Sequence, residues 1–538
     1  MTVSILKDFP VNTTTSNFQF TPAVTALTGG RFLVTWSSSS ASDVSSDIRA
    51  RIYNADGTAV GPDAIVNSSS LGSQNFPSVT TLSDGRFVFA WESFPTARNS
   101  NITAHIYNAD GTTSGDDFVA NTTDAVSERL PTITALTGGR FVVSWDSETT
   151  SRDFDVRARI YGADGKPVAK DFQVNTTTAE SQQNSTVEGL TDGRFVVAWE
   201  SHAGISTDPE IRARIYGANG KAVGTDFVVN SSPTYEMAAP AVSALSGGRF
   251  VVTWDSSEIS TGNDIRGRIY KADGTPAAKD FRVSQATAVD HYTSQVTDLA
   301  DGRFAVVWQS REATGPGLDV RARIFLGDGT VAGNEFIVNS STKGDQIDVS
   351  AAALSDGRLA VSWYSNGVDA YGDIAATIIN PLKYTGTNAA ETWRGGNFAD
   401  RIYGLGGNDK LYGGSGKDLL VGGKGADTLN GGKGSDSYSY TATNEGGDTI
   451  ASFTSADQLR FKAAAFGFVK TGSIAADQFH VVTKGHAAGD AEDRFIFNTT
   501  DDTLWADIDG AKGPAKAVLN ADFTASGHDV VVEDFWIV

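Results

Sequence analysis

Short blocks of alternating hydrophobic and polar residues recur at a nearly constant spacing over the first 380 residues. A block such as DGRFVVAW, which ends at Trp199, returns with tryptophan at positions 36, 91, 145, 199, 254, 308 and 363, so that neighbouring copies lie 54 or 55 residues apart. Alternation with period two between turn residues predicts β-strands. Seven copies at one period predict a single supersecondary unit repeated seven times.

Each repeat contains four blocks of this kind. The tryptophan block is followed by a Ser- or Gly-rich loop, a block such as DVRARIYGADG (155–165), a short block such as DFQVN (171–175) and a run such as PTITAL (131–136). Four short antiparallel strands per repeat are typical of the blades of a β-propeller. The alternative is a linear β-solenoid or sandwich array, which would need capping repeats at its ends.

The two ends of the repeat array are complementary. The seventh repeat has DGRLAVSW (356–363) and DIAATII (373–379) but no DFxVN block, and the missing copy is DFPVN at 8–12. If this N-terminal strand completes the last blade, the ring closes and no sheet edge is left unprotected. We therefore predict an all-β chain with a seven-bladed propeller over 1–380, closed by the N-terminal strand. The segment MTVSILKDFPVN also lacks the basic and apolar regions of a secretory signal, so we expect no removable targeting peptide there.

A second repeat, with a period of nine, runs from Gly395 to Ser439. It reads GGNFADRIY, GLGGNDKLY, GGSGKDLLV, GGKGADTLN and GGKGSDSYS. The sixth position is always aspartate, and the eighth is aliphatic or aromatic. Glycines permit tight turns with positive φ, so backbone carbonyls and carboxylates from successive turns can converge as the six to eight oxygens that calcium prefers. The candidate metal residues are Asp400, Asp409, Asp418, Asp427, Asp436, Gly406, Gly413, Gly416, Gly422 and Gly425. Phe398 and Leu405 replace glycines in the first two copies, which puts the first site in question.

This nonapeptide resembles the repeat of RTX (hemolysin-type calcium-binding) proteins, which forms a parallel β-roll. The resemblance covers about 390–538, because GGDTIASF (446–453), DRFIFNTTDDTLWADIDG (493–510) and the end HDVVVEDFWIV are similar to the C-terminal region of that family. It implies bound Ca2+, an uncleaved signal for a type I exporter, and an extracellular or cell-surface location in a Gram-negative bacterium. We predict a linker at 381–394, the calcium-binding roll at 395–440 and a β-rich secretion domain at 441–538.

Bulk composition agrees with this picture. The chain of 538 residues has no cysteine, a net charge of −21 and no long apolar run. These features argue against disulfides, nucleic acid partners and membrane insertion, and they favour cations.

Residues shared by the propeller repeats are predicted to be scaffold. Arg157 and Arg159 lie on one face of a strand, where carboxylates such as Asp146 or Glu200 could pair with them. Recognition is expected where the repeats differ, on the face built from the loops before the first strand and after the second strand of each blade. Candidate ligand residues there are Phe94, Arg98, Tyr235, His291, Tyr292, Tyr364 and Tyr371.

The predicted channel gives little support for catalysis. The innermost strands place small or hydroxylated residues at Thr25, Thr80, Thr134, Ser243, Thr297 and Ala352, and only Glu188, with Asp298 nearby, could ionise. We see no catalytic triad or metalloprotease motif. We therefore expect a propeller that binds carbohydrate or a surface macromolecule, as an adhesin, biofilm matrix or surface-coat component. The alternatives are a polysaccharide hydrolase or lyase with a loop-built site and a self-assembling surface-layer component.

Overall fold

The structure is a computed structural model that describes residues 2–538 except 15–17, 40–44, 70, 96–98, 123–126, 151–152, 179, 203–208, 232–236, 259–261, 286–288, 312–316, 368–371, 490, 508–516 and 524–529. It confirms an all-β chain, in which the described helical residues form only short 3-10 turns at Thr28–Gly30, Thr137–Gly139, Ser246–Gly248, Ala476–Gln478 and Val532–Asp534. No described helix is long and apolar enough to cross a bilayer. Two compact units are present: 5–331 with 335–379, and 2–4 with 332–334 and 380–538.

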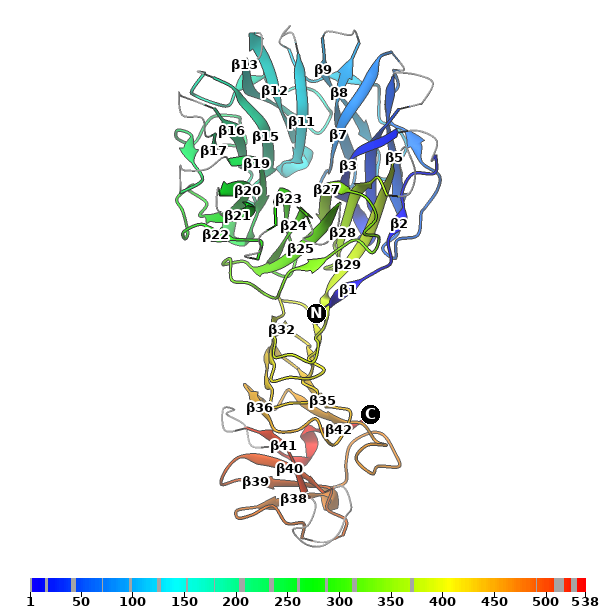
Figure 1. Cartoon of the computed structure of the whole chain (residues 1–538), viewed down its shortest axis with the longest axis vertical. Coiled ribbons are helices and arrows are strands. Elements are labelled where there is room, and N and C mark those ends of the chain that lie inside the picture. The colour runs from blue at the N-terminus through cyan, green and yellow to red at the C-terminus, as the bar shows by residue number, and fades with distance from the viewer. Residues whose placement is uncertain are drawn as a thin grey trace. The chain divides into compact units, whose positions relative to one another are not determined.

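The first unit is a propeller whose blades follow one another around a ring (Figure 1). The first strands of the blades are β3 (Phe18–Ala26), β7 (Ser73–Thr81), β11 (Glu128–Ala135), β15 (Gln182–Gly189), β19 (Met237–Ala244), β23 (His291–Asp298) and β27 (Gln346–Ala353). The second strands are β4 (Phe32–Ser39), β8 (Phe87–Phe94), β12 (Phe141–Thr150), β16 (Phe195–Ser201), β20 (Phe250–Glu258), β24 (Arg303–Arg311) and β28 (Leu359–Ser365). The third strands are β5 (Ser46–Tyr53), β9 (Asn101–Tyr107), β13 (Asp153–Tyr161), β17 (Glu210–Tyr216), β21 (Gly262–Tyr270), β25 (Leu318–Leu326) and β29 (Asp373–Thr385). The fourth strands are β6 (Ala64–Ile65), β10 (Phe118–Val119), β14 (Phe172–Gln173), β18 (Phe227–Val228), β22 (Phe281–Arg282), β26 (Phe336–Ile337) and β2 (Phe9–Pro10).

The N-terminal strand closes the ring, as the sequence predicts. Six blades are separate four-stranded sheets, and in the seventh β2 pairs antiparallel with β29, with Phe9 opposite Ala376. Asn12 follows β2 and accepts the N–H of Ile374 at 2.7 Å. The equivalent Asn67 accepts the N–H of Ile48 at 2.7 Å within the first blade. The same bond therefore forms over a sequence separation of 362 in the last blade and of 19 in the first.

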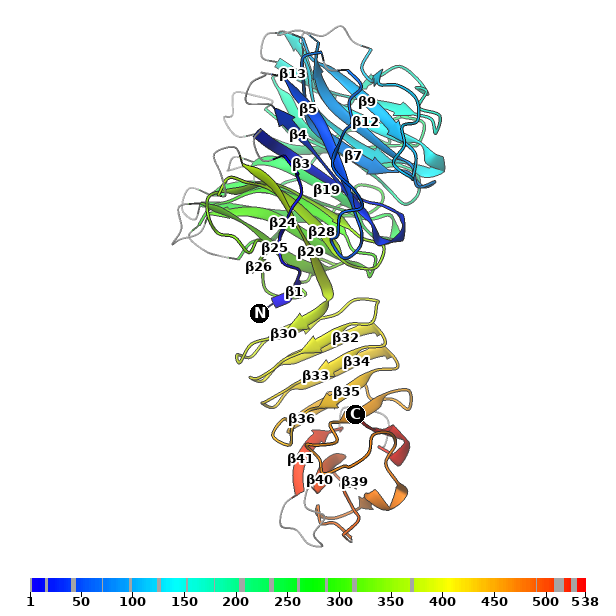
Figure 2. The ribbon, with the colours of Figure 1, turned by 90° about the vertical axis from the view of Figure 1, so that its right-hand side faces the viewer.

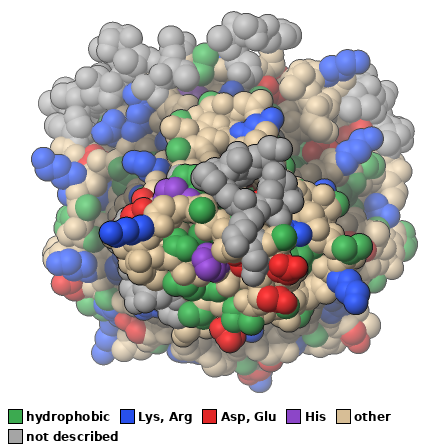
Figure 3. Space-filling model, turned by 90° about the horizontal axis from the view of Figure 1, so that it is seen from below, with side chains coloured by type: hydrophobic (Ala, Val, Ile, Leu, Met, Phe, Trp, Pro, Cys, Tyr) green, Lys and Arg blue, Asp and Glu red, His purple; other side chains and the backbone are tan. Residues whose placement is uncertain are grey.

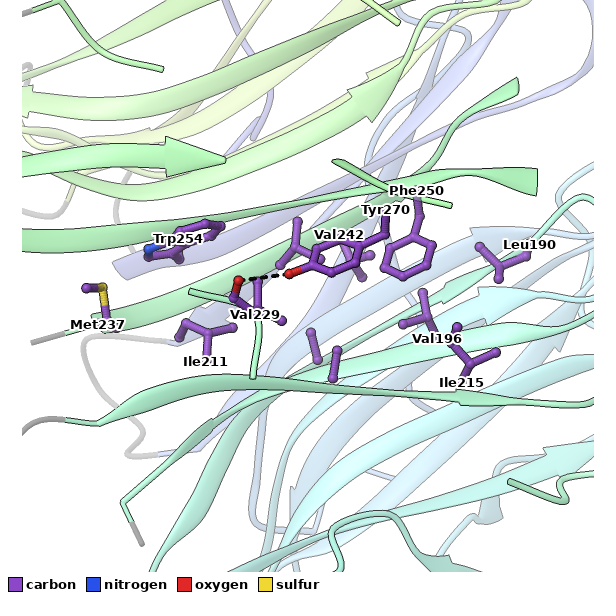
Figure 4. Close-up of a cluster of buried hydrophobic side chains, with 13 residues drawn as sticks. Leu190, Val196, Ile211, Ile215, Val229, Met237, Val242, Phe250, Trp254 and Tyr270 are labelled. Atoms are coloured by element: carbon purple, nitrogen blue, oxygen red, sulfur yellow. Dashed lines mark hydrogen bonds between the residues drawn. The ribbon is translucent and has the colours of Figure 1, made fainter. Parts of the chain in front are cut away.

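Each blade packs against the next through the repeated aromatic residues. Figure 4 shows one such cluster, in which Trp254 is fully buried and the hydroxyl of Tyr270 donates to the carbonyl oxygen of Val229 at 2.8 Å. Tyr53 makes the matching bond to Val11 across the closing junction. Burial of a large apolar side chain contributes about 1.5–3 kcal/mol, so this repeated packing explains why the tryptophans recur.

Arg157 serves the scaffold, but the partner expected for it was wrong. Its guanidinium lies 3.3 Å from Asp171 on the DFxVN block, whereas Asp146 accepts backbone N–H groups of the next blade. Arg157 stands opposite Trp145 in the sheet. Successive side chains of a strand point to opposite faces, so Asp146 faces away from Arg157.

The second unit begins as a parallel β-roll whose strands are stacked in two sheets (Figure 2). One sheet continues from the end of β29 through β31 (Arg401–Tyr403), β33 (Leu419–Val421), β35 (Ser437–Tyr440), β37 (Gln458–Phe461) and β42 (Phe535–Ile537). The other contains β30 (Thr392–Arg394), β32 (Lys410–Gly416), β34 (Thr428–Gly434), β36 (Asp448–Ala451), β41 (Ala517–Asp522), β40 (Thr503–Asp507), β39 (Phe495–Asn498) and β38 (Phe479–Val482). β1 (Thr2–Ile5) also pairs with β29.

Strand register shows that the roll extends beyond the nonapeptides. Residues 381–394, where we expected a linker, include the end of β29 and all of β30, which pair with β31 and β32. Tyr384 and Trp393 are buried there and stack with ring centroids 4.3 Å apart, because they occupy the inward position of the repeat. On the C-terminal side, β36 and β37 add a further coil within the 441–538 region.

Candidate calcium sites and the variable-loop face

The aspartates of the nonapeptides form two stacked rows along the roll. The N–H of Asp400 donates to Oδ1 of Asp418 at 2.8 Å, and the N–H of Asp409 donates to Oδ1 of Asp427 at 2.7 Å. Both bonds join residues 18 positions apart, which is one coil of two nonapeptides. Each predicted aspartate is almost completely buried, and its Oδ1 or its N–H takes part in these hydrogen bonds along the row.

The second carboxylate oxygen has no protein partner at several of these positions. Oδ2 is buried without a hydrogen bond in Asp409, Asp427, Asp436 and Asp448. A buried unsatisfied oxygen is costly, and a charged one more so, unless a cation neutralises it. These atoms are therefore available as ligands of a hard cation.

Glycine makes room for these oxygens. A Cβ added to Gly422 would lie 2.3 Å from Oδ2 of Asp427. A Cβ at Gly434, whose φ is +140°, would lie 1.6 Å from the carbonyl oxygen of Gly416 one coil away. Among the described residues, no three or more His, Cys, Asp or Glu side chains form a ready-made metal site, so a cation here would be held by a few carboxylates together with backbone carbonyls. Calcium accepts that ligand set, so the residues present fit it.

The raised pKa values of the aspartates in the rows also favour binding of a cation. Burial, with a contribution from neighbouring carboxylates, raises the pKa of Asp409 to about 6 and that of Asp448 to about 8. Burial also raises the pKa of Asp427 and Asp436 above the ordinary value. The protein alone therefore disfavours their charged forms, and a bound divalent cation would favour them.

One end of each row is satisfied by the protein itself. Oδ2 of Asp457 accepts the N–H of Thr454 at 2.8 Å and its hydroxyl at 3.0 Å. At the other end, Glu391 accepts the N–H of Thr387 at 2.8 Å and its hydroxyl at 2.9 Å. Both turns are thus closed by their own threonine, whereas Asp409, Asp427 and Asp436 keep a carboxylate oxygen open.

The structure adds residues that sequence reasoning missed. Asp448 and Asp457 extend the two rows, since they accept the N–H groups of Asp427 and Asp436 at 3.0 and 2.7 Å. Their signal is an aspartate two positions before a buried aliphatic residue, in GGDTI and ADQLR, although the spacing has grown to 21. In the first coil, Leu405 adopts φ +72° in place of glycine.

The propeller has a pocket of about 470 Å³ where the first strands of all seven blades converge. In each of these strands one non-glycine residue has a positive φ, at Thr21, Phe76, Leu130, Asn184, Ala239, Thr293 and Asp348. The pairing register shifts at the same place, as in a β-bulge, and proline follows four of the seven residues. The bulges form a ring of strained backbone around the pocket, which the strand periodicity did not predict.

Carboxylates from neighbouring blades hold these bulges. Asp146, directly after Trp145, accepts the N–H of Asn184 at 2.8 Å, and Glu200 accepts that of Ala239 at 2.6 Å. Burial raises the pKa of Asp146 to about 7. The acidic residues after the tryptophans are therefore part of the junction between blades.

The predicted ligand residues are placed unevenly. Arg98, Tyr235 and Tyr371 lie outside the described residues. Phe94, Tyr292 and Tyr364 are half-buried at the ends of β8, β23 and β28. His291 is fully buried, and its Nδ1 accepts the indole N–H of Trp308, as Gln182 does for Trp199. This position gives His291 a packing role, and the ligand role of the whole group stays a prediction.

Glu188 and Asp298 lie on the first strands of two blades. The hydroxyl of Thr134 donates to Glu188 at 3.3 Å, and the hydroxyl of Ser243 accepts the N–H of Asp298 at 3.0 Å. Burial raises the pKa of each carboxyl to about 7, and their mutual repulsion adds to the shift of Glu188. Both groups could exchange a proton near neutral pH.

Comparison with protein families identifies the nonapeptide region. Residues 385–420 and 412–441 match the sequence profile of the RTX calcium-binding nonapeptide repeat, in four copies. No curated protein sequence matches the chain.

Several solved structures resemble this chain over 70% of its length. A protein of unknown function from Dyadobacter fermentans is 13% identical with a TM-score of 0.47, and it covers 70% of this chain and 99% of its own. An α-L-arabinanase from Penicillium chrysogenum is 12% identical with a TM-score of 0.43, covering 70% and 99%. The polysaccharide lyase Uly1 is 9% identical with a TM-score of 0.46, covering 70% and 100%. At these values their activities say nothing about this chain. The chain therefore carries RTX calcium-binding nonapeptide repeats at 385–441, joined to a β-propeller.

Proposed function

We propose that this protein is an extracellular binding protein whose roll is folded by calcium and whose propeller presents its variable-loop face to carbohydrate or another surface macromolecule. The observation that carries the calcium part is the set of buried Oδ2 atoms without a protein partner in Asp409, Asp427 and Asp436. Calcium would supply the positive charge that these oxygens lack.

The residues of the roll would couple calcium to export. In a cytosol with little calcium, the stacked carboxylates repel one another and oppose folding of the roll. A ligand that binds only the folded state stabilises it by RT ln(1 + [L]/Kd), about 2.7 kcal/mol per site at a hundredfold excess over Kd. We infer that a type I exporter recognises a signal in the 441–538 region and carries the chain out of the cell. The roll then folds outside the cell.

The propeller supports a binding role through its pocket and loops. The pocket of about 470 Å³ is lined by prolines and by side chains such as Thr132 and Ser350 of the first strands. Hydroxyl and amide groups on a rigid ring can hydrogen-bond sugar hydroxyls, and half-buried aromatic residues such as Tyr292 can stack on sugar rings.

Binding of the full-length, calcium-loaded protein to an array of bacterial surface glycans tests this proposal. We expect selective retention without cleavage, and a loss of at least tenfold in affinity for Phe94→Ala, Tyr292→Ala and Tyr364→Ala. Lys166→Ala is the matched control, because Lys166 lies on a hairpin turn away from these loops. No retention, together with calcium-dependent polymers in solution, would favour the self-assembling component instead.

A polysaccharide hydrolase or lyase is the second candidate, and the raised pKa values of Glu188 and Asp298 favour it. Two carboxyls that titrate near pH 7 could act as general acid and base. The unbound glycans of the same array are assayed for cleavage products. Products that form with the native protein but not with Glu188→Gln would establish the enzyme and overturn the purely binding role.

A further inference from the structure

The roll carries a groove whose basic lining its calcium sites do not account for. It has a volume of about 770 Å³ and lies on the outward face of the sheet formed by the end of β29 with β31, β33, β35 and β37. The outward positions of these strands are the seventh and ninth of the nonapeptide. In the surface seen from below, basic, acidic and hydrophobic side chains are interspersed (Figure 3), whereas the groove brings basic side chains together beside the aspartates of one calcium row.

Four basic side chains line this groove: Lys383, Arg401, Lys417 and Arg460. Lys383 and Arg401 are register partners on neighbouring parallel strands, which lie about 4.8 Å apart. Like charges at such positions are destabilising. None of the four makes an ion pair within the described part of the chain, and Nε of Arg460 is buried without a hydrogen-bond partner. An arrangement that weakens the free protein and leaves a guanidinium donor unused indicates a bound anion.

The acidic residues of the groove belong to the calcium row. Asp400, Asp418 and Asp436 line its floor and are almost completely buried. While they are charged and without calcium, they offset the four cations. Neutralisation of this row by calcium would leave the groove positive in a chain whose net charge is −21. The attraction for an anion would therefore depend on calcium.

The remaining lining indicates the kind of anion. Tyr403, Ser437 and Gln458 offer a ring face, a hydroxyl and an amide between the basic groups. The five strands span about 19 Å at about 4.8 Å per strand, which suits an extended oligomer rather than a single small ion. Arginine binds carboxylate and sulfate groups bidentately. A duplex nucleic acid carries one charge per 1.7 Å or so, so the acidic remainder of the chain would repel it more strongly than a sparsely charged glycan.

We propose that this groove binds a linear acidic polysaccharide when the roll is loaded with calcium. The site uses residues of the roll alone, so its test does not depend on whether the propeller loops bind a ligand.

The test measures affinity of the full-length calcium-loaded protein for size-defined oligosaccharides by titration calorimetry. One arm uses a uronate oligomer, one a sulfated oligomer and one a neutral oligomer of the same length, which distinguishes the two sources of negative charge. Arg401→Gln with Arg460→Gln is expected to lower affinity for a charged oligomer at least tenfold, since a hydrogen bond to a charged group is worth roughly 1.5–3 kcal/mol. The neutral oligomer should not bind the groove.

Lys410→Gln is the matched control. Lys410 is exposed and occupies the same seventh position on the opposite sheet, where it pairs with Thr392 and Thr428. The affinity of the Lys410→Gln variant for a charged oligomer should stay within twofold of that of the native protein. The calcium-induced change in circular dichroism is the control for folding of each variant. If the double arginine variant does not fold, the same affinity measurement uses Lys417→Gln, which changes a residue at an exposed turn. Equal losses for Lys410→Gln, unchanged affinity in the arginine variants, or stronger binding of duplex DNA would overturn the proposal.

Discussion

The backbone N–H of Asp436 donates a hydrogen bond of 2.7 Å to Oδ1 of Asp457, across a spacing of 21 residues where the preceding coils use 18. The row of carboxylates thus continues past the last nonapeptide. Asp457 differs from the members before it, because Thr454 of its own turn satisfies its second oxygen. The carboxylate of Asp436 therefore needs a cation, whereas that of Asp457 does not.

Calcium binding should distinguish these two positions. Asp436→Asn removes the charge of a buried oxygen that has no protein partner, so we expect one fewer calcium ion bound or at least a tenfold loss of affinity. Asp457→Asn disturbs only the bonds with Thr454, so it should lower the free energy of unfolding by about 1–3 kcal/mol with the calcium count unchanged. Titration calorimetry and thermal unfolding measure the two effects. An equal loss of calcium in both variants would show that the turn at Asp457 also binds the ion.

A glycine pair tests the cradle of the calcium sites. Gly434 and Gly447 both have positive φ, so alanine strains the backbone at each by about 1 kcal/mol. A Cβ at Gly434 would also collide with the carbonyl oxygen of Gly416, whereas a Cβ at Gly447 meets nothing within 4 Å. We expect Gly434→Ala to weaken calcium binding at least tenfold and Gly447→Ala to leave it unchanged. If both variants bind calcium like the native protein, the carbonyls around Gly434 are not ligands.

The closure of the propeller depends on Asn12. Asn12→Ala leaves the N–H of Ile374 without its acceptor, and Asn67→Ala does the same to Ile48 within one blade. Each should lower the free energy of unfolding of the propeller by about 1–3 kcal/mol. Deletion of residues 2–12 should do more, because it exposes the edge of β29 and the apolar junction behind Val11. Sedimentation should then show self-association. A monomer with native stability would contradict closure by this strand.

Stability of the propeller should fall as pH rises through neutrality. Burial raises the pKa of the Asp146 carboxyl from its ordinary value of 3.8 to about 7. The N–H groups of Asn184 and Ser185 and the charge of Arg129 oppose this shift in part. A raised folded-state pKa means that its stabilising contribution is complete below about pH 4 and is lost as pH rises through about 7. Asp146→Asn should flatten the pH dependence of chemical unfolding between pH 5 and about 8.5, followed with calcium in excess.

The exposed Asp164 serves as the control for this measurement, because its pKa is lowered by the N–H of Lys166 and it titrates below that window. A slope between pH 5 and about 8.5 that persists in Asp146→Asn would assign the effect to other carboxyls, such as Glu92, whose pKa is about 7.

Much of the fold follows from the spacing of a few residues. The tryptophan period and the displaced DFPVN block predict the ring and its closure, because each blade must repeat the packing around Trp254 and its equivalents. The roles of individual polar residues follow less readily. The partner of Arg157 depends on which face of the strand each side chain takes, and the bulge at Thr21 depends on how seven strands meet around one axis.

The candidate calcium site shows the same division. The nine-residue period predicts the aspartate rows, since glycine and aspartate stand in fixed places in every copy. Asp448 joins its row at a spacing of 21, and only the strand register of β34 with β36 reveals it. The closing turn at Thr454 has no glycine and that at Thr387 keeps only Gly386, so their satisfied carboxylates were not predictable from the repeat.

Hydrogen exchange of the full-length protein with and without calcium tests the central claim most directly. The account predicts that amides of 395–461 exchange rapidly in a chelator and gain protection of at least a hundredfold, about 2.7 kcal/mol, in excess calcium. Amides of 18–365 in the propeller strands should be protected in both conditions. Equal protection of 395–461 with and without calcium would contradict the claim that calcium folds the roll.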